Sequence, residues 1–247
     1  MSDKLLNTEE AARFLRVSEA SIRRWSDAGL LPVRRIGGRR ERRFREADLI
    51  QYLGAGLPSG GALPAAGAAA LNVGGVQLPL HSHVATFYNT DAGRLRLTIP
   101  FLADGIRAGQ PCFLAADSGV AAAYKEALRE QGLDAEGAIK SGTLVVVDGP
   151  GTTVPGAIAF WEQSIWSVLA GGQTVIRVVG EMGSERKVFV SDAEMMSYEI
   201  AFNMIAKRFP TVTLCQYDVR EFDGETIFQA MRAHPDLYSV HLGSFLN

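Results

Sequence analysis

The chain has 247 residues, a formal net charge of −2, a hydrophobic content of 47% and a charged content of 21%. This composition is that of ordinary globular domains and excludes global disorder, collagen-like repeats and a coiled-coil rod. The charge is divided unevenly, because residues 1–54 hold 12 Lys and Arg against 8 Asp and Glu, whereas residues 55–247 hold 13 against 19. A basic head of net charge +4 is therefore joined to an acidic body of net charge −6.

No segment of the chain resembles a membrane span or a secretory signal. No stretch approaches the roughly 18 consecutive apolar residues of a transmembrane helix, and the start MSDKLLNTEE has no apolar core after its first charges. The only cysteines are Cys112 and Cys215, too few for a disulfide scaffold or a four-thiolate zinc site. We therefore expect a cytoplasmic protein with reduced thiols, and the sequence identifies no cofactor.

Residues 5–53 carry the pattern of a winged helix-turn-helix. Thr8 precedes a helix-period segment, and Ser18 can cap a second one, SEASIRRWSDAG, after a short turn. The pair Gly37-Gly38 predicts a hairpin turn between two short arginine-rich strands, and EADLIQYL predicts a closing helix. The head is therefore expected to be a small DNA-binding unit.

The arginines of the head favour binding to nucleic acid. Arg presents a fixed fork of donors that fits phosphates and guanine edges, and the hairpin lifts several arginines away from the helices. The aromatic residues Trp25 and Phe44 are instead expected to lie in the core of the head. We expect phosphate contacts to provide most of the affinity for DNA.

Three motifs follow one another in the head: LNTEEAARFLRVSEASIRRWSDAGLLP, GGRRERRF and EADLIQYL. In this order they resemble the DNA-binding domains of the MerR family and related excisionase-like proteins. MerR regulators usually continue into a long dimerising helix, which is missing here, so the resemblance does not extend to a coiled-coil dimer. The resemblance implies that Ser18, Ser21, Arg23 and Arg24 lie in or beside the major groove of double-stranded DNA, and that Arg39, Arg40, Arg42 and Arg43 hold phosphates.

A segment without charged residues separates the head from the body. No Asp, Glu, Lys or Arg occurs between Asp48 and Asp91, and residues 55–79 are rich in Gly, Pro and Ala. Such a composition predicts a flexible linker. We therefore expect a head over residues 1–54 and a body over residues 80–247.

In the body, apolar strand-like runs alternate with helix-period segments. Strands are predicted at residues 84–89, 111–116, 143–148, 174–180 and 211–217, and helices at residues 91–108, 119–131, 155–170, 192–208 and 224–233. Nearly continuous apolar strands that each precede a helix predict a three-layer α/β domain with a mainly parallel sheet. Ligands bind such sheets outside the carboxyl ends of the strands. The phosphate-loop sequence GxxxxGK[ST] is absent, so nucleotide hydrolysis is not expected.

Polar residues lie near the ends of the predicted strands and on one predicted helix. Among them are His83, Glu199, Cys215 and His234, side chains of the kinds that bind a transition metal or hydrogen-bond a small polar ligand. His83 is expected to point inward, whereas His81 falls at the end of the linker. Each residue also has a purely structural interpretation, because apolar strands commonly bury a cysteine and helices commonly end before a His-Pro pair.

Several short motifs recur along residues 80–243: HVATFYNTDAGRLRLTIPFLADGIRAGQPCFLAAD, RVVGEMG, YEIAFN, LCQYD and RAHPD. Together they resemble the MEDS domain, the DcmR-type sensory domain of microbial regulators and signalling kinases. The resemblance implies a fold similar to RecA and KaiC ATPases without their phosphate loop, and the sensing of small hydrocarbon derivatives. It also implies that the ligand pocket contains His83, Tyr88, Glu181, Tyr198, Glu199, Cys215, Tyr217, Asp218 and His234.

These features predict a one-component transcriptional regulator that binds promoter DNA through the head and a small effector, organic or metal, through the body. Two other interpretations remain open. One is an enzyme, with Cys215 as nucleophile or with a catalytic metal held by His83, Cys215 and His234. The other is an interaction module that recruits a signalling protein. We favour the regulator, without enzymatic activity, and expect a homodimer formed through the body, because one small head makes few contacts with DNA.

Overall fold

A computed structural model describes residues 5–15, 19–27, 31–37, 41–49, 70–239 and 242–247. The chain divides into two compact units, residues 1–62 and residues 63–247, and each is described by itself. We call them the head unit and the α/β unit. In these described parts of the chain, every helix is too short or too polar to cross a membrane.

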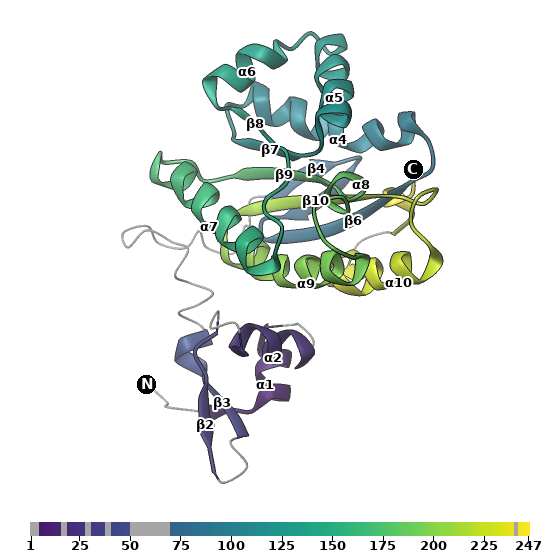
Figure 1. Ribbon diagram of the computed structural model, residues 1–247. Helices are drawn as coiled ribbons and strands as arrows, with labels where there is room; N and C mark the ends of the chain where they lie inside the picture. Colours follow the sequence, from purple (N-terminus) through teal and green to yellow (C-terminus); the bar gives the residue numbers. More distant parts are fainter. Residues whose placement is uncertain (1–4, 16–18, 28–30, 38–40, 50–69, 240–241) are drawn as a thin grey trace. The chain divides into compact units, whose positions relative to one another are not determined.

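The head unit combines two helices with a three-stranded antiparallel sheet. The helices are α1 (Thr8–Leu15) and α2 (Glu19–Asp27), and the sheet has the order β1 (Leu5–Leu6), β3 (Glu41–Arg45), β2 (Arg34–Ile36). Strands β2 and β3 form the predicted arginine-rich hairpin, which extends away from the two helices in Figure 1. The order of helix, helix and hairpin agrees with the predicted winged helix-turn-helix.

Local contacts of the head unit differ from the prediction in one place. Helix α1 begins with a capping box, in which the Asn7 side chain accepts from the Glu10 amide and the Glu10 carboxylate accepts from the Asn7 amide, both at 2.8 Å. Asn7 is therefore the cap, and Thr8 is the first helical residue. Phe44 is fully buried, as predicted. The side chain of Trp25 lies outside the described residues.

The α/β unit is built on a five-stranded parallel sheet. Its order is β6 (Ser82–Tyr88), β10 (Thr211–Asp218), β9 (Ile176–Glu181), β7 (Cys112–Ala115) and β8 (Leu144–Val147). Every residue of the first four of these strands is buried, so helices must cover both faces of the sheet. The predicted α/β fold with a parallel sheet is confirmed.

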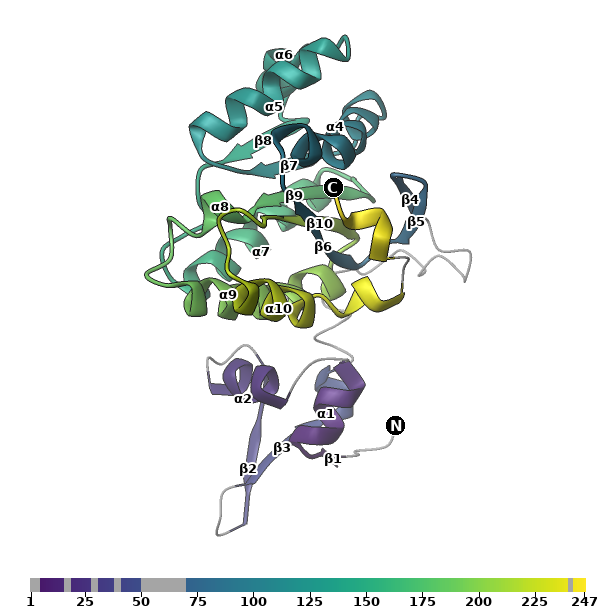
Figure 2. The ribbon, with the colours of Figure 1, turned by 90° about the vertical axis from the view of Figure 1, so that its right-hand side faces the viewer.

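Helices cover the sheet on two sides, as Figures 1 and 2 show. On one face Trp161 packs edge-on against Phe113 of β7, and on the other Arg177 of β9 donates to the carbonyl of Phe101. The first face carries α7 (Val154–Ala170), α9 (Asp192–Arg208) and α10 (Gly224–Ala233), and the second carries α4 (Asp91–Arg107), α5 (Ser118–Glu130) and α6 (Ala135–Ser141). A short helix, α8 (Met182–Glu185), follows β9 directly. The three layers leave polar side chains buried on both faces of the sheet.

Two further segments join the α/β unit. Strands β4 (Ala70–Val73) and β5 (Val76–Pro79) form an antiparallel hairpin beside α4, within the range predicted as linker. The reason is local: Gly74 and Gly75 have φ of +57° and +89° and make a two-residue turn. Residues 55–69 of the predicted linker lie outside the described residues. At the edge of the sheet, the amide of Asn247 donates to the carbonyl of Phe87 at 2.7 Å.

Candidate functional site

The predicted ligand residues of the α/β unit lie on both faces of the sheet. Side chains alternate along a strand, so Cys215 and Tyr217 of β10 point toward α9 while Asp218 points toward α4. On β6 the same alternation places His83 on the α9 side and Tyr88 on the α4 side. The nine predicted residues therefore do not converge on one pocket.

Four residues meet on the α9 side, and we call them the His/Cys/Glu cluster: His83 of β6, Glu199 of α9, Cys215 of β10 and His234, which follows α10. Each is at most 4% exposed. One nitrogen, sulfur or oxygen atom from each residue lies within 4.8 Å of the others. His83 Nε2 is 3.1 Å from Cys215 Sγ, and His234 Nε2 is 2.9 Å from Glu199 Oε2. The sequence prediction placed all four residues in the pocket, and the structure brings them together.

Surrounding groups fix the orientation of both imidazoles. The Asn203 amide donates its Nδ2 hydrogen to the carbonyl of Ala233 at 2.6 Å, so its Oδ1 accepts from His83 Nδ1 at 3.0 Å. His234 Nδ1 lies 2.7 Å from the carbonyl of Ala230, an atom that can only accept. Both Nδ1 atoms therefore carry the hydrogen, and both Nε2 atoms face the inside of the cluster. Asn203 is four residues after Glu199 on α9, a spacing that places the two on one helix face.

Burial controls the ionisation of the cluster. It raises the pKa of the Cys215 thiol well above its ordinary value, and together with the neighbouring His234 it lowers the pKa of His83 to about 3. Burial would also raise the pKa of Glu199, but contact with His234, and to a lesser extent with His83, leaves it below the ordinary value. The Tyr217 hydroxyl adds a hydrogen bond of 2.9 Å to Glu199. A buried, protonated thiol is a poor nucleophile, which disfavours the covalent-enzyme interpretation.

A second buried cluster lies on the α4 side of the sheet, and we call it the Tyr/Glu cluster: Tyr88, Tyr124, Glu181 and Gln216. Tyr88 donates to Glu181 Oε2 at 3.1 Å, and the Tyr124 hydroxyl lies 2.6 Å from Glu181 Oε1. The same hydroxyl contacts Gln216 Oε1, and the Gln216 amide is oriented by its Nε2 bond of 2.8 Å to the carbonyl of Arg94. Sequence reasoning missed Tyr124, because a tyrosine in an alanine-rich helix carries no sign of its burial.

Burial and the surrounding hydrogen bonds favour the protonated form of Glu181. The Tyr124 hydroxyl has one hydrogen but faces acceptor oxygens of both Glu181 and Gln216, and a protonated Glu181 carboxyl supplies the second hydrogen. The pKa agrees, because burial raises the pKa of Glu181 to about 7 against the lowering effects of Tyr124, Arg94 and Tyr88 and with a small raising effect from Asp218. Glu181 is therefore largely neutral below neutral pH.

Besides Tyr217, which hydrogen-bonds to Glu199, two predicted residues join neither cluster. The Tyr198 hydroxyl accepts from Trp161 Nε1 at 2.8 Å, and its ring packs against Phe189. Asp218 is held by Arg220, whose Nη2 lies 2.6 Å from Asp218 Oδ2. Of the two, Tyr198 lies on the side of the His/Cys/Glu cluster, where its ring packs against Phe189 and Phe202.

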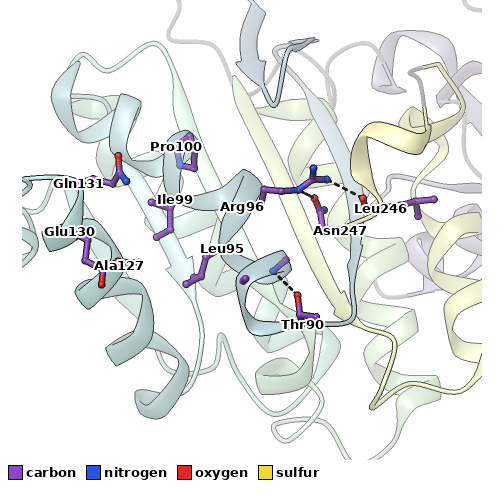
Figure 3. A pocket seen from close by; sticks show the side chains of 12 residues that line it. Thr90, Leu95, Arg96, Ile99, Pro100, Ala127, Glu130, Gln131, Leu246 and Asn247 are labelled. Atoms are coloured by element: carbon purple, nitrogen blue, oxygen red, sulfur yellow. Dashed lines mark hydrogen bonds between the residues drawn. The ribbon is translucent and has the colours of Figure 1, made fainter.

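An open groove of about 710 Å³ lies elsewhere on the α/β unit (Figure 3). It runs between α4, α5 and the C-terminal residues, and Arg96 bridges one side of it by donating to Asn247 Oδ1 at 2.6 Å and to the carbonyl of Leu246 at 3.0 Å. None of the nine predicted ligand residues lines this groove. The groove therefore adds a surface feature that the sequence did not predict.

In the head unit, the described arginines of the DNA prediction hold acidic partners. Arg23 pairs with Glu19, Arg43 with Glu41, and Arg42 contacts both oxygens of Asp27 at 2.7 Å. The hydrogen bond from Arg42 is the main reason that the pKa of Asp27 is lowered. Ser18, Arg39, Arg40 and the side chains of Ser21 and Arg24 lie outside the described residues.

The hairpin also places arginines opposite one another. Arg34 pairs with Arg43 and Arg35 with Arg42 in the β2–β3 register, and Arg34 and Arg35 are exposed. Like charges directly opposite each other on a sheet are destabilising unless anions compensate them. Arg34 and Arg35 were missing from the predicted set, although their place in the sequence VRRIGG lies directly before the hairpin turn.

Comparison with known proteins gives three matches. Residues 82–235 match the family described as MEDS, the methanogen/methylotroph DcmR sensory domain. Residues 5–56 match a helix-turn-helix domain family. The chain is also 36% identical over 252 residues to the transcriptional repressor DcmR of Methylorubrum extorquens, with 97% of this chain and 93% of the relative covered. The helix-turn-helix and MEDS predictions are confirmed, whereas the narrower MerR-like assignment stays a prediction.

Proposed function

Because this chain belongs to the family of MEDS-domain proteins, here with a helix-turn-helix domain in front, we propose that it is a one-component transcriptional regulator. The head unit binds double-stranded promoter DNA, and the α/β unit binds a small effector that changes the affinity for DNA. The similarity to a transcriptional repressor along nearly the whole chain supports this proposal. We assign no enzymatic reaction to the protein, because the buried thiol of Cys215 is a poor nucleophile.

The observation that carries the DNA half is the arginine hairpin. Two arginine pairs face each other across β2 and β3, and in one of them, Arg35 with Arg42, both side chains share the single carboxylate of Asp27. The other pair, Arg34 with Arg43, has the exposed Glu41 as the counter-charge of Arg43. Phosphates of a DNA backbone would supply the further negative charge. In this proposal the described hairpin arginines work with Arg39 and Arg40 on the backbone, while Ser18, Ser21, Arg23 and Arg24 of the helix-turn-helix serve the major groove.

The substitution Arg43→Ala is expected to weaken binding to DNA of every sequence. Loss of one phosphate contact should reduce the slope of log K against log salt concentration by about 0.9. Fluorescence anisotropy with a short duplex at several salt concentrations measures this slope. The matched control is Arg13→Ala, which removes the same charge from an exposed position on α1. Equal slopes for both variants would remove Arg43 from the interface.

The sensory half of the proposal requires a ligand with unequal affinity for two states. An effector shifts DNA affinity only if it binds the DNA-competent and DNA-free forms differently. Titration of the protein–DNA complex with small hydrocarbon derivatives and other small organic molecules tests this directly, and no change in DNA affinity with any of them would contradict the sensory half. We also propose a homodimer formed through the α/β unit, because two heads provide the specificity that one small head lacks. Sedimentation at equilibrium measures this state.

A further inference from the structure

The His/Cys/Glu cluster aims four donor atoms at one buried point. We infer that this cluster is a binding site for a single transition-metal dication of the Zn²⁺ type, with His83, Glu199, Cys215 and His234 as its four ligands. The inference deepens the proposed function, on which it rests for the assumption that the α/β unit binds a ligand. It is carried by the directions of the lone pairs, the spacing of the donors and the balance of charge.

The first argument is the orientation of the imidazoles. Because Asn203 and the carbonyl of Ala230 take the Nδ1 hydrogens, the lone pairs of both Nε2 atoms point into the cluster. His234 Nε2 has no hydrogen-bond partner of good geometry, although it lies 2.9 Å from Glu199 Oε2. A bare nitrogen lone pair beside a carboxylate oxygen is repulsive unless a cation stands between them. An Nδ1 bond to a carbonyl or amide oxygen is also the usual support for a histidine that binds metal through Nε2.

The second argument is the spacing of the donors. Tetrahedral zinc with bonds of about 2.0 to 2.3 Å has donor-to-donor edges of about 3.3 to 3.8 Å. Two edges of the cluster are 3.1 Å from His83 Nε2 to Cys215 Sγ and 3.8 Å from His83 Nε2 to Glu199 Oε2, and the four donor atoms all lie within 4.8 Å of one another. Small shifts of the side chains bring all four donors to bonding distance. The same spacing has no room for an organic molecule between them.

The third argument is the balance of charge in a site without water contact. As metal ligands, Cys215 binds as a thiolate and Glu199 as a carboxylate, while His83 and His234 bind as neutral imidazoles through Nε2. When the ion binds, the thiol proton of Cys215 leaves to solvent. The two anionic ligands then neutralise the two charges of the dication. Binding therefore avoids the large cost of adding an unbalanced charge to the interior.

The experiment uses the full chain without an affinity tag, treated with a chelator and then titrated with Co²⁺ and afterwards with Zn²⁺. We expect one ion per chain, a thiolate-to-cobalt charge-transfer band, tetrahedral d–d bands, and release of about one proton per ion, from the Cys215 thiol, into a weakly buffered solution. Zn²⁺ should displace Co²⁺ and abolish these bands, since a tetrahedral site prefers zinc.

Two cysteine variants provide the matched comparison. Cys215→Ser should lose the sulfur band and bind Zn²⁺ at least about 100-fold more weakly, whereas Cys112→Ser removes an equally buried thiol and should keep the band. Asn203→Ala, which removes the support of His83, should keep the band and lower affinity about 10-fold to 100-fold; this variant decides the matter if Cys215→Ser does not fold. A folded wild-type chain that binds no ion, or a sulfur band that survives Cys215→Ser, overturns the inference. Such a chain that still binds DNA would leave the regulator proposal intact.

Discussion

The substitution Phe44→Ala is expected to abolish DNA binding by the full chain while the α/β unit stays folded. Phe44 is completely buried in the head unit, opposite Leu6 in the β1–β3 register. Truncation of a buried phenylalanine costs about 3 to 5 kcal/mol of unfolding free energy. A unit of this size has a total stability of only a few kcal/mol, about 0.05 to 0.15 kcal/mol per residue. The head should therefore be largely unfolded in this variant.

Two measurements test the Phe44 prediction. Fluorescence anisotropy with a duplex at low salt reports DNA binding, and hydrogen exchange followed by mass spectrometry reports separately on peptides of the head unit and the α/β unit. Phe14→Ala is the matched control, because Phe14 is 37% exposed on α1 of the same unit and its loss should leave binding near wild type. Wild-type affinity in Phe44→Ala would show that binding does not depend on the folded head.

The substitution Glu181→Gln is expected to remove the contribution of this carboxyl to the pH dependence of stability of the α/β unit. Burial raises the pKa of Glu181 from an ordinary value of 4.5 to about 7, so the folded state holds the proton more tightly than the unfolded state. The resulting stabilisation is complete below pH 4.5 and is lost as pH rises through 7. Between pH 5 and pH 8 the wild-type protein should lose about 2 to 3 kcal/mol through this group. Gln reproduces the protonated carboxyl, since its amide donates to Tyr124 and accepts from Tyr88.

Urea unfolding of the wild-type chain and Glu181→Gln at pH 5 and pH 8 measures this effect. The difference in unfolding free energy between the two should shift by about 2 to 3 kcal/mol in favour of the variant as pH rises. Glu130→Gln, at an exposed position of α5, controls for the loss of a carboxylate and should show no such shift. A difference that is constant with pH would mean that Glu181 is ionised in the folded protein at both pH values.

The elements of the α/β unit could be predicted well because its strands are buried on both faces. Such strands appear as continuous apolar runs, and the helices predicted at residues 192–208 and 224–233 coincide with α9 and α10. The β4–β5 hairpin was missed for the opposite reason. Its buried residues, Leu71, Val73 and Leu78, are few and alternate with exposed ones, and the surrounding Gly, Pro and Ala dominate the composition.

The candidate site could be predicted only in part. Residue type and position near strand ends identified the members of the His/Cys/Glu cluster, but their assembly depends on how α9 and the end of α10 lie on the sheet. The sequence alone could have shown that the predicted pocket residues lie on both faces of the sheet. Cys215 and Asp218 are three residues apart on one strand, so their side chains point to opposite faces. The role of Tyr124 depends on contacts with Glu181 and Gln216, which lie 57 and 92 residues away in the chain.

The most direct test of the regulator proposal is selection of duplexes from a randomised DNA pool by the full chain, followed by sequencing of the retained DNA. The proposal predicts enrichment of one sequence motif, bound at least about 10³-fold more tightly than an unrelated duplex at physiological salt. It further predicts that the enrichment disappears with Phe44→Ala. Retention of all sequences equally, or no retention at any salt concentration, would contradict a sequence-specific DNA-binding function.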